Sequence, residues 1–377
     1  MEHPPTYTRQ HMNKPSQIHQ FSTDISLGDA VSNHILDTAK TLNDAGYSSK
    51  VFCENPAPAD VGYPIYPIDS YENEASIDSI LFVHFTICYP QQMMVRLKKL
   101  HNKKVLVYHN ITPHVYFYGI NEGSYHAAQL GRQQLRFLAS FIDTAIGDSS
   151  YNCAELRANG WETVYQLPIS FDTARLDTKP SSRVMNWGEE GTNILFVGRI
   201  APNKKFEDLL LTYYYVKNRV LPDARLVLVG SDSGMQSYAG YLQAIIKRLQ
   251  LSDVHITGHV SISELVAYYR TASIYLSMSE HEGFGVPLLE SIYFDVPVLA
   301  YKSTAVPETL AGRGVLFTEK RYDAVAELIG TLVNDKELHQ QIVTNQRSLL
   351  KNYSYKSFQE KLLTIVDSVA NGAPTSI

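Results

Sequence analysis

Two carboxylates and two glycines lie together in the stretch SEHEGFGVPLLES, residues 279–291, between an apolar run and a helix-like pattern. Pro287 suits a first helical turn, so we expect free backbone amides there, at the positive end of a helix dipole. Such an end binds anions, and phosphate above all. Gly283 and Gly285 let a ligand approach the backbone, and Glu282 and Glu290 suit the hydroxyls of a sugar and a ribose. On this stretch alone, a purely structural reading of both acids stays open.

A second chemical element is the stretch FVGRIAPNKKFEDLL, residues 196–210. Gly198 ends an apolar run, and Arg199 and Lys204 lie on the loop before the next helix-like pattern. Arginine grips phosphate with two hydrogen bonds, whereas lysine acts as a compact point charge. The two cations therefore predict a diphosphate site, and the alternative is that they are ordinary solvated loop residues.

These elements together resemble the retaining family 4 glycosyltransferases of GT-B architecture, also called glycosyl transferases group 1. The resemblance is carried by the pair of glutamates eight residues apart around GFG and by GR followed by Lys204. It extends to GHVS (258–261), AVPE (305–308) and PISFD (168–172). It implies two Rossmann-like, doubly wound parallel-sheet domains that face a central cleft.

The resemblance also implies residue roles. Arg199 and Lys204 bind the donor diphosphate, Glu290 takes the ribose hydroxyls, and Glu282 holds the transferred sugar together with the backbone that follows it. The residues implied in donor binding are Gly198, Val260, Gly283, Phe284, Gly285, Val286 and Glu290. Those implied in catalysis are Arg199, Lys204, Glu282 and His109.

In the first half of the chain the candidates are fewer. The stretch YHNITP (108–113) places His109 at the end of an expected strand, where the resemblance implies a histidine near the donor sugar. A structural histidine is the equally weighted alternative. LGDAV (27–31) stands where the family has a glycine-rich loop, so Gly28 and Asp29 are candidates for contact with phosphate or acceptor.

The implied reaction moves a sugar, with retention, from a nucleoside diphosphate sugar to a hydroxyl of a saccharide or lipid-linked saccharide. We expect no cofactor and no metal, because the chain contains no Asp-x-Asp and its cations can stabilise the leaving group. Two alternatives stay open. One is a nucleotide-sugar epimerase of the same architecture, and the other is a catalytically silent scaffold that only binds partners.

Composition sets the broad class. The chain has 377 residues, 44% of them hydrophobic and 19% charged, which is a globular balance. A net charge of -5 disfavours nucleic acid as a partner. Three cysteines without paired spacing and the lack of a long apolar run predict a cytoplasmic protein.

Short apolar runs alternate with helix-like patterns along the whole chain, which predicts parallel sheets covered on both faces. We expect a tail over 1–16, an acceptor domain over 17–170 and a nucleotide-sugar-binding domain over 171–352. Residues 353–377 are expected to form a helix that crosses back to the first domain, followed by a tail.

The segment PQQMMVRLKKLHNKK, residues 90–104, carries methionines and leucines on one side and five cations around them. It fits peripheral contact with an anionic membrane on the cytoplasmic side. The favoured alternative is an ordinary surface helix whose lysine stems cover apolar surface.

Overall fold

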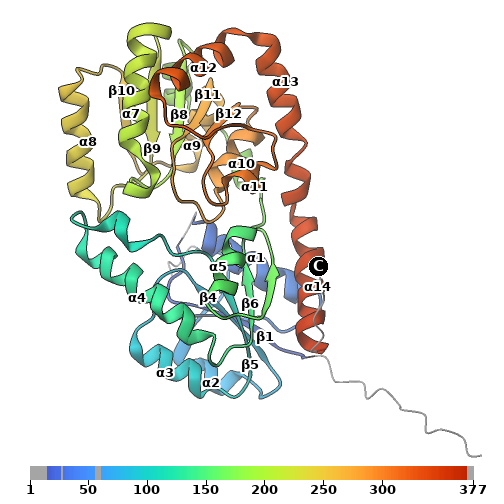
Figure 1. The fold of residues 1–377 in the computed structure, drawn as a ribbon. Coiled ribbons are helices and arrows are strands. Elements are labelled where there is room, and N and C mark those ends of the chain that lie inside the picture. Colours follow the sequence, from blue (N-terminus) through green and yellow to red (C-terminus); the bar gives the residue numbers. More distant parts are fainter. Residues whose placement is uncertain (1–14, 27–28, 56–60, 372–377) are drawn as a thin grey trace, which may run out of the picture.

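The computed structural model describes residues 15–26, 29–55 and 61–371. Two parallel sheets lie one above the other, and the last two helices run down one side of both (Figure 1). The N-terminal sheet has the strand order β3-β2-β1-β4-β5-β6-β7 and the C-terminal sheet the order β10-β9-β8-β11-β12-β13. The parallel sheets expected from the alternating pattern are confirmed, and so are the two doubly wound GT-B domains that the resemblance implies.

The inner N-terminal strands are largely buried apolar runs, as strands covered on both faces must be, and the edge strands β3 and β7 are partly exposed. They are β1 (Ile18–Ser22), β2 (Val51–Cys53), β3 (Ile65–Pro67), β4 (Ile80–Phe85), β5 (Lys103–Tyr108), β6 (Thr144–Gly147) and β7 (Thr163–Gln166). The helices of this domain are α1 (Ala30–Asp44), α2 (Tyr71–Glu74), α3 (Gln91–Lys99), α4 (Glu122–Leu138) and α5 (Ser150–Ala158).

The C-terminal strands are β8 (Asn193–Val197), β9 (Arg225–Val229), β10 (Val254–Gly258), β11 (Ile274–Ser277), β12 (Val298–Tyr301) and β13 (Val315–Phe317). The helices are α6 (Ser182–Gly188), α7 (Phe206–Tyr215), α8 (Gln236–Arg248), α9 (Ile262–Thr271), α10 (Val286–Tyr293), α11 (Val306–Leu310), α12 (Tyr322–Asn334) and α13 (Lys336–Arg347). The sequence pattern missed β3, α2, α6 and α11, which are too short to show a period.

Helix α14 (Tyr355–Asn371) follows the second domain but packs on the first. Its apolar face, with Phe358 and Leu362, shares a buried cluster with Ile18 of β1, Phe82 of β4 and Val105 of β5. This helix ties the two domains together at their edge (Figure 1).

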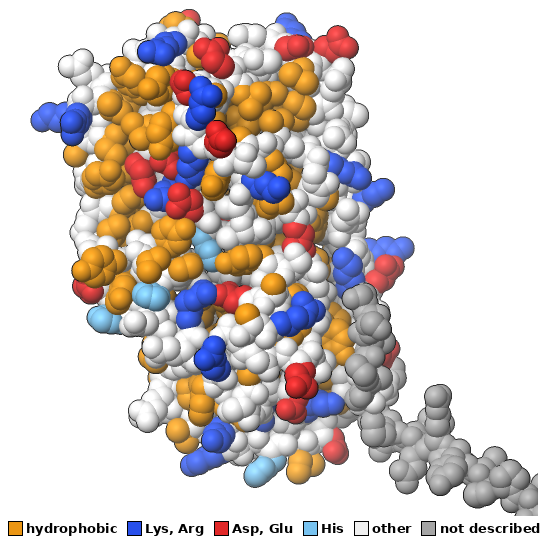
Figure 2. All heavy atoms as spheres, in the orientation of Figure 1, with side chains coloured by type: hydrophobic (Ala, Val, Ile, Leu, Met, Phe, Trp, Pro, Cys, Tyr) orange, Lys and Arg blue, Asp and Glu red, His pale blue; other side chains and the backbone are white. Residues whose placement is uncertain are grey.

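Charges are mixed on the outside of the molecule. Acidic and basic side chains are interspersed over the face that Figure 2 shows, without a broad area of one sign. A phosphate backbone needs a continuous basic surface, and this face does not offer one.

Candidate functional site

The N-terminus of α10 is built as the sequence predicts. Gly285 precedes the helix with a φ of +99°, a left-handed conformation that glycine adopts without strain. No side chain of the described residues caps this helix, and a proline occupies its first turn. Pro287 lacks an amide hydrogen, and the Leu288 amide donates to the Gly285 carbonyl at 3.0 Å. The first turn therefore offers an anion the amide of Val286, at the positive end of the helix dipole.

Each of the two glutamates has its own cation. The Lys204 ammonium lies 2.5 Å from Oε2 of Glu282, and the Arg175 guanidinium forms an ion pair with Oε1 of Glu290. The hydroxyl of Tyr269 donates to the other oxygen of Glu290 at 2.6 Å. Two free carboxylates beside a diphosphate would repel it, and these pairings remove most of that repulsion.

A cavity of about 360 Å³ lies between α1 of the first domain and α10 of the second. Its volume is at the lower end of the range of ligand pockets. The C-terminal domain contributes Val286 and Glu290 to its wall, as expected for donor-binding residues. The rest of the lining is Ala30, Asn33, Leu36, Asp37, Ile169, Ser170, Phe171, Asp172, Arg175, Val197, Leu265 and Pro287.

Asp37 is the acid that α1 brings to this cavity. Burial raises the pKa of its carboxyl to about 6, and the nearby charge of Asp172 acts in the same direction. Ser170 lies in the same wall, and its buried hydroxyl interacts with the Asp37 carboxylate and opposes part of that rise. The cavity therefore offers a ligand a titratable acid beside a buried hydroxyl.

The two cations expected to hold a diphosphate have different partners. Lys204, at the end of the short 3-10 helix Pro202–Lys204, pairs with Glu282. Arg199 is exposed, and its guanidinium donates to the carbonyl of Ser233 at 3.0 Å. Gly198 ends β8 with its amide bonded to the carbonyl of Val229. The structure thus places both cations at the expected strand end without bringing them against one group.

Loop 278–285, which carries Glu282, rests directly on the N-terminal domain. A Cβ built on Gly283 would lie 2.8 Å from Cβ of Asn110, so only glycine fits against this part of the N-terminal domain. The Ser149 hydroxyl donates to the Gly283 carbonyl at 2.9 Å. Phe284 is buried against Tyr353, which leaves its backbone rather than its ring for a ligand.

His109 is buried, which favours the structural alternative, and its place near the donor sugar stays a prediction. Its side chain has no exposed surface, and Nδ1 lies 3.1 Å from Oδ2 of Asp148 while Nε2 lies 3.0 Å from Nδ1 of His84. His84 in turn bonds to Gln20, so the histidine belongs to a buried polar chain inside the domain. The residue after it, Asn110, faces the second domain instead.

Three further candidates have simpler outcomes. Gly28 lies outside the described residues. Asp29 is exposed and caps α1 by accepting from the amide of Ser32 at 3.0 Å, a structural role. Val260 is half-buried between β10 and α9, and its contact with a nucleotide base stays a prediction.

The methionine and leucine side of segment 90–104 is not available to a membrane, and contact of this segment with a membrane through other residues stays a prediction. Met93, Met94 and Leu97 are buried in the core of the domain. Arg96 is paired with Asp69 and Glu72, and the Lys104 ammonium is bonded to the carbonyls of Leu100 and Asn102. The apolar side of this helix is therefore a packing face.

Five residues of the site escaped sequence reasoning: Asp37, Asn110, Arg175, Tyr269 and His281. Each is a common polar type in an ordinary helix or loop, without a spacing that singles it out. Asn110 carried a weak signal, since it follows a predicted strand end and precedes two loop residues and a proline. Asp37 and His281 become visible only where the two domains meet, and Arg175 and Tyr269 only where distant segments of the second domain pack around Glu290.

The described ranges contain neither a side-chain group suited to a metal ion nor a helix suited to span a membrane. No group of three or more His, Cys, Asp or Glu side chains there has a geometry suited to a metal ion. None of the described helices is long and apolar enough to cross a membrane.

Comparison with known proteins shows a family likeness of the C-terminal domain. Residues 177–349 match the family model of glycosyl transferases group 1. A GDP-mannose-dependent alpha-(1-6)-phosphatidylinositol monomannoside mannosyltransferase of Mycobacterium tuberculosis is 25% identical over 225 residues, 55% of this chain and 57% of that protein. An uncharacterized glycosyltransferase of Haemophilus influenzae is 23% identical over 235 residues, 61% of this chain and 64% of that protein. These alignments span less than two thirds of the relatives' length.

Solved structures agree over nearly the whole chain. HepE of Anabaena, in complex with UDP and glucose, has a TM-score of 0.74 at 17% identity, with 94% of this chain and all of that chain covered. Sucrose-phosphate synthase of Thermosynechococcus elongatus has a TM-score of 0.75 at 15% identity, with 95% of this chain and all of that chain covered. At such identities the likeness establishes the GT-B fold alone.

Proposed function

The C-terminal domain of this chain belongs to glycosyl transferases group 1, and from that premise we propose that the chain is a retaining hexosyltransferase. It takes a sugar from a nucleoside diphosphate sugar and transfers it to a hydroxyl of a saccharide or lipid-linked saccharide acceptor. Its place is in polysaccharide or glycoconjugate biosynthesis. Two relatives support the proposal. One is the mannosyltransferase of Mycobacterium tuberculosis, and the other is a capsular polysaccharide biosynthesis glycosyltransferase of Staphylococcus aureus.

One observation carries the proposal: the interdomain cavity combines Glu290 with the open end of α10. A nucleoside diphosphate has a ribose to bind and a pyrophosphate to neutralise. Each carboxylate oxygen has two lone pairs, so Glu290 accepts ribose hydroxyls while it keeps Arg175 and Tyr269. The start of α10, with the amide of Val286, then faces the pyrophosphate.

In the chemical step the bond from the anomeric carbon to the phosphate oxygen breaks, and a bond to the acceptor oxygen forms. Negative charge builds on the departing nucleoside diphosphate. Lys204, Arg199 and the N-terminus of α10 stabilise that charge in a cleft with little water. Arg199 is exposed and has one hydrogen bond, so it can exchange the Ser233 carbonyl for a phosphate oxygen.

Retention follows when the acceptor attacks from the face that the diphosphate leaves. The acceptor proton passes to an oxygen of the departing phosphate, so no protein base is required. Glu282, neutralised by Lys204, holds the sugar hydroxyls. We further propose that transfer proceeds without a divalent metal, because these cations and the helix end take over charge stabilisation.

The cytoplasm is the proposed location, on the ground that Cys53, Cys88 and Cys153 are all free thiols.

A thermal-shift panel of UDP, GDP, ADP and their sugars tests the proposal. A ligand at 100 times its Kd stabilises a protein by about 2.7 kcal/mol, which is readily measured. We expect one base to be preferred and its nucleotide sugar to be hydrolysed slowly with retention at the anomeric carbon, seen by NMR. The same assay with EDTA is expected to give an unchanged rate.

If no nucleotide or nucleotide sugar stabilises the chain at millimolar concentration, the proposal is wrong. A rate that disappears with EDTA and returns with magnesium contradicts the metal-free part alone. Inversion at the anomeric carbon contradicts the retaining mechanism but not the proposal that the chain transfers a sugar.

A further inference from the structure

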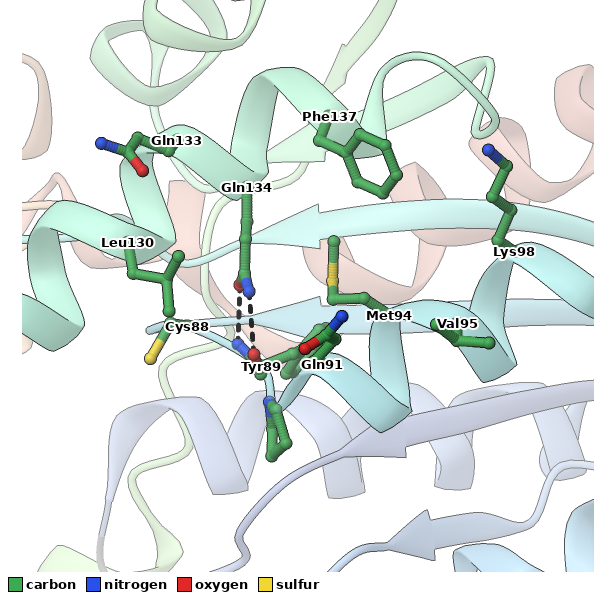
Figure 3. A pocket seen from close by; sticks show the side chains of 11 residues that line it. Cys88, Tyr89, Gln91, Met94, Val95, Lys98, Leu130, Gln133, Gln134 and Phe137 are labelled. Carbon is green, nitrogen blue, oxygen red and sulfur yellow. Dashed lines mark hydrogen bonds between the residues drawn. The ribbon is translucent and has the colours of Figure 1, made fainter.

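A second, larger cavity lies outside the cleft, as an open groove of about 700 Å³ between α3 and α4. Both helices begin at the cleft edge of the N-terminal sheet, since α3 follows β4 and the cap of α4, Asn121, donates to the carbonyl of Gly234 in the second domain. The groove is lined by Cys88, Tyr89, Pro90, Gln91, Met94, Val95, Lys98, Leu130, Gln133, Gln134 and Phe137 (Figure 3).

The groove is apolar and exposes its side chains. The amide of Gln134 makes two hydrogen bonds of 2.8 Å with the backbone of Tyr89, so the polar groups of its floor are satisfied (Figure 3). Val95 is 46% exposed, Leu130 44% and Phe137 45%. Adjacent Ile87 is 40% exposed, so four of the eight large hydrophobic side chains exposed among the described residues gather here. Such a gathering indicates a contact surface.

Basic residues outnumber acidic residues on the two helices that form the groove. Helices α3 and α4 carry five basic residues, Arg96, Lys98, Lys99, Arg132 and Arg136, and one acid, Glu122. Arg96 is paired with Asp69 and Glu72, and Arg132 with Glu155. Within the described residues, Lys98, Lys99 and Arg136 form no ion pair with an acid. A basic face on a chain of net charge -5 orients the whole molecule toward an anionic surface.

We propose that the α3–α4 face docks on an anionic lipid bilayer. Val95, Leu130 and Phe137 enter the boundary between headgroups and acyl chains, and Lys98, Lys99 and Arg136 lie against the anionic headgroups. A bilayer fits better than a protein helix because the rim has basic groups without the alternating acids and directional partners that specify a protein register. If the proposed function holds, this surface identifies the acceptor as lipid-linked, since it brings the cleft edge close to the bilayer.

Flotation of the full chain with two kinds of vesicle tests the docking surface. One vesicle contains phosphatidylcholine alone, and the other contains phosphatidylcholine with about one third phosphatidylglycerol. Three unpaired cations predict about 100-fold stronger partition into the anionic vesicle at low salt. Raising the ionic strength to 1 M should remove most of that preference.

Two variants separate the contributions of charge and of apolar contact to vesicle binding. Lys98→Glu/Lys99→Glu/Arg136→Glu should abolish the preference for anionic vesicles. Val95→Ser/Phe137→Ser should weaken binding to both vesicles by at least 10-fold. Matched controls lie on α8 of the other domain, where Lys247→Glu/Arg248→Glu changes exposed charge and Tyr241→Ser removes an apolar side chain that is 54% exposed.

Wild-type protein that floats with neither vesicle overturns the proposal, and so does a charge-reversal variant that floats as well as wild type. Nucleotide thermal shifts of each variant show that the variant is folded. Because those shifts and hydrolysis of a soluble donor need no vesicle, they test the proposed transferase independently of the docking surface.

Discussion

The side chains of Asn110 and His281 join the two domains by a hydrogen bond of 2.6 Å. Asn110 donates its amide to Asn152 at 2.8 Å, so its carbonyl oxygen accepts from Nε2 of His281. Burial, with help from the charges of Arg132 and Lys204, lowers the pKa of His281 to about 4. The neutral ring therefore holds the Glu282 loop in register with the first domain throughout the physiological pH range.

Removing the Asn110 side chain should lower kcat by roughly 10-fold or more, because Glu282 loses its fixed position. Asn110 has a φ of +74°, a left-handed conformation that asparagine tolerates, that strains alanine and that glycine adopts freely. Asn110→Ala and Asn110→Gly should therefore lose kcat alike, while the glycine variant melts at a higher temperature. If kcat instead follows the melting temperature, Asn110 acts through stability and not through the loop.

Lys204→Ala should lower kcat by about 10²–10³-fold, as the loss of one transition-state donor does. Lys205→Ala is the matched control, since its ammonium lies 3.5 Å from both Glu207 and Glu280 and we assign it no contact with the donor. Steady-state kinetics with the preferred donor decide the matter. If turnover stays normal and only the donor KM rises, Lys204 binds the donor equally in the ground state and in the transition state, and its catalytic role is wrong.

Glu290→Gln should weaken binding of the free nucleoside diphosphate by about 10-fold or more in calorimetry, because ribose hydroxyls lose a charged acceptor. Tyr269→Phe removes one hydrogen bond from Glu290 and keeps the carboxylate. Its effect on the Kd should therefore be several-fold smaller. An unchanged Kd in the glutamine variant removes Glu290 from the ribose site.

Asp37→Asn should stabilise the protein at neutral pH. The folded-state pKa of Asp37 is raised to about 6, so its favourable contribution is complete below the unfolded pKa of about 4 and is lost as pH rises through 6. The asparagine variant mimics the neutral acid. It should melt at the wild-type temperature near pH 4 and above it near pH 8, by at most about 3 kcal/mol in stability.

The exposed Asp44→Asn, at the end of the same helix, is the control for the loss of one negative charge. A stabilisation of equal size at both pH values would show that the charge of Asp37 is not the cause.

The sequence by itself determined the architecture and the main chemical elements. Apolar runs and helix patterns alternate with enough contrast to predict two parallel sheets, and the proline and glycines before Glu290 predict where α10 begins. These features are local, because a strand, a cap or a helix start depends on neighbours along the chain.

Only the tertiary structure decided which side chains meet. Lys204 goes to Glu282 and Arg175 to Glu290, His109 turns into the core, and Asn110 turns outward because the backbone changes direction after β5. The cavity wall that contains Asp37 exists only where α1 of one domain lies opposite α10 of the other. Contacts between segments that lie tens to more than a hundred residues apart depend on how the elements and the domains pack, and no spacing along the chain encodes that packing.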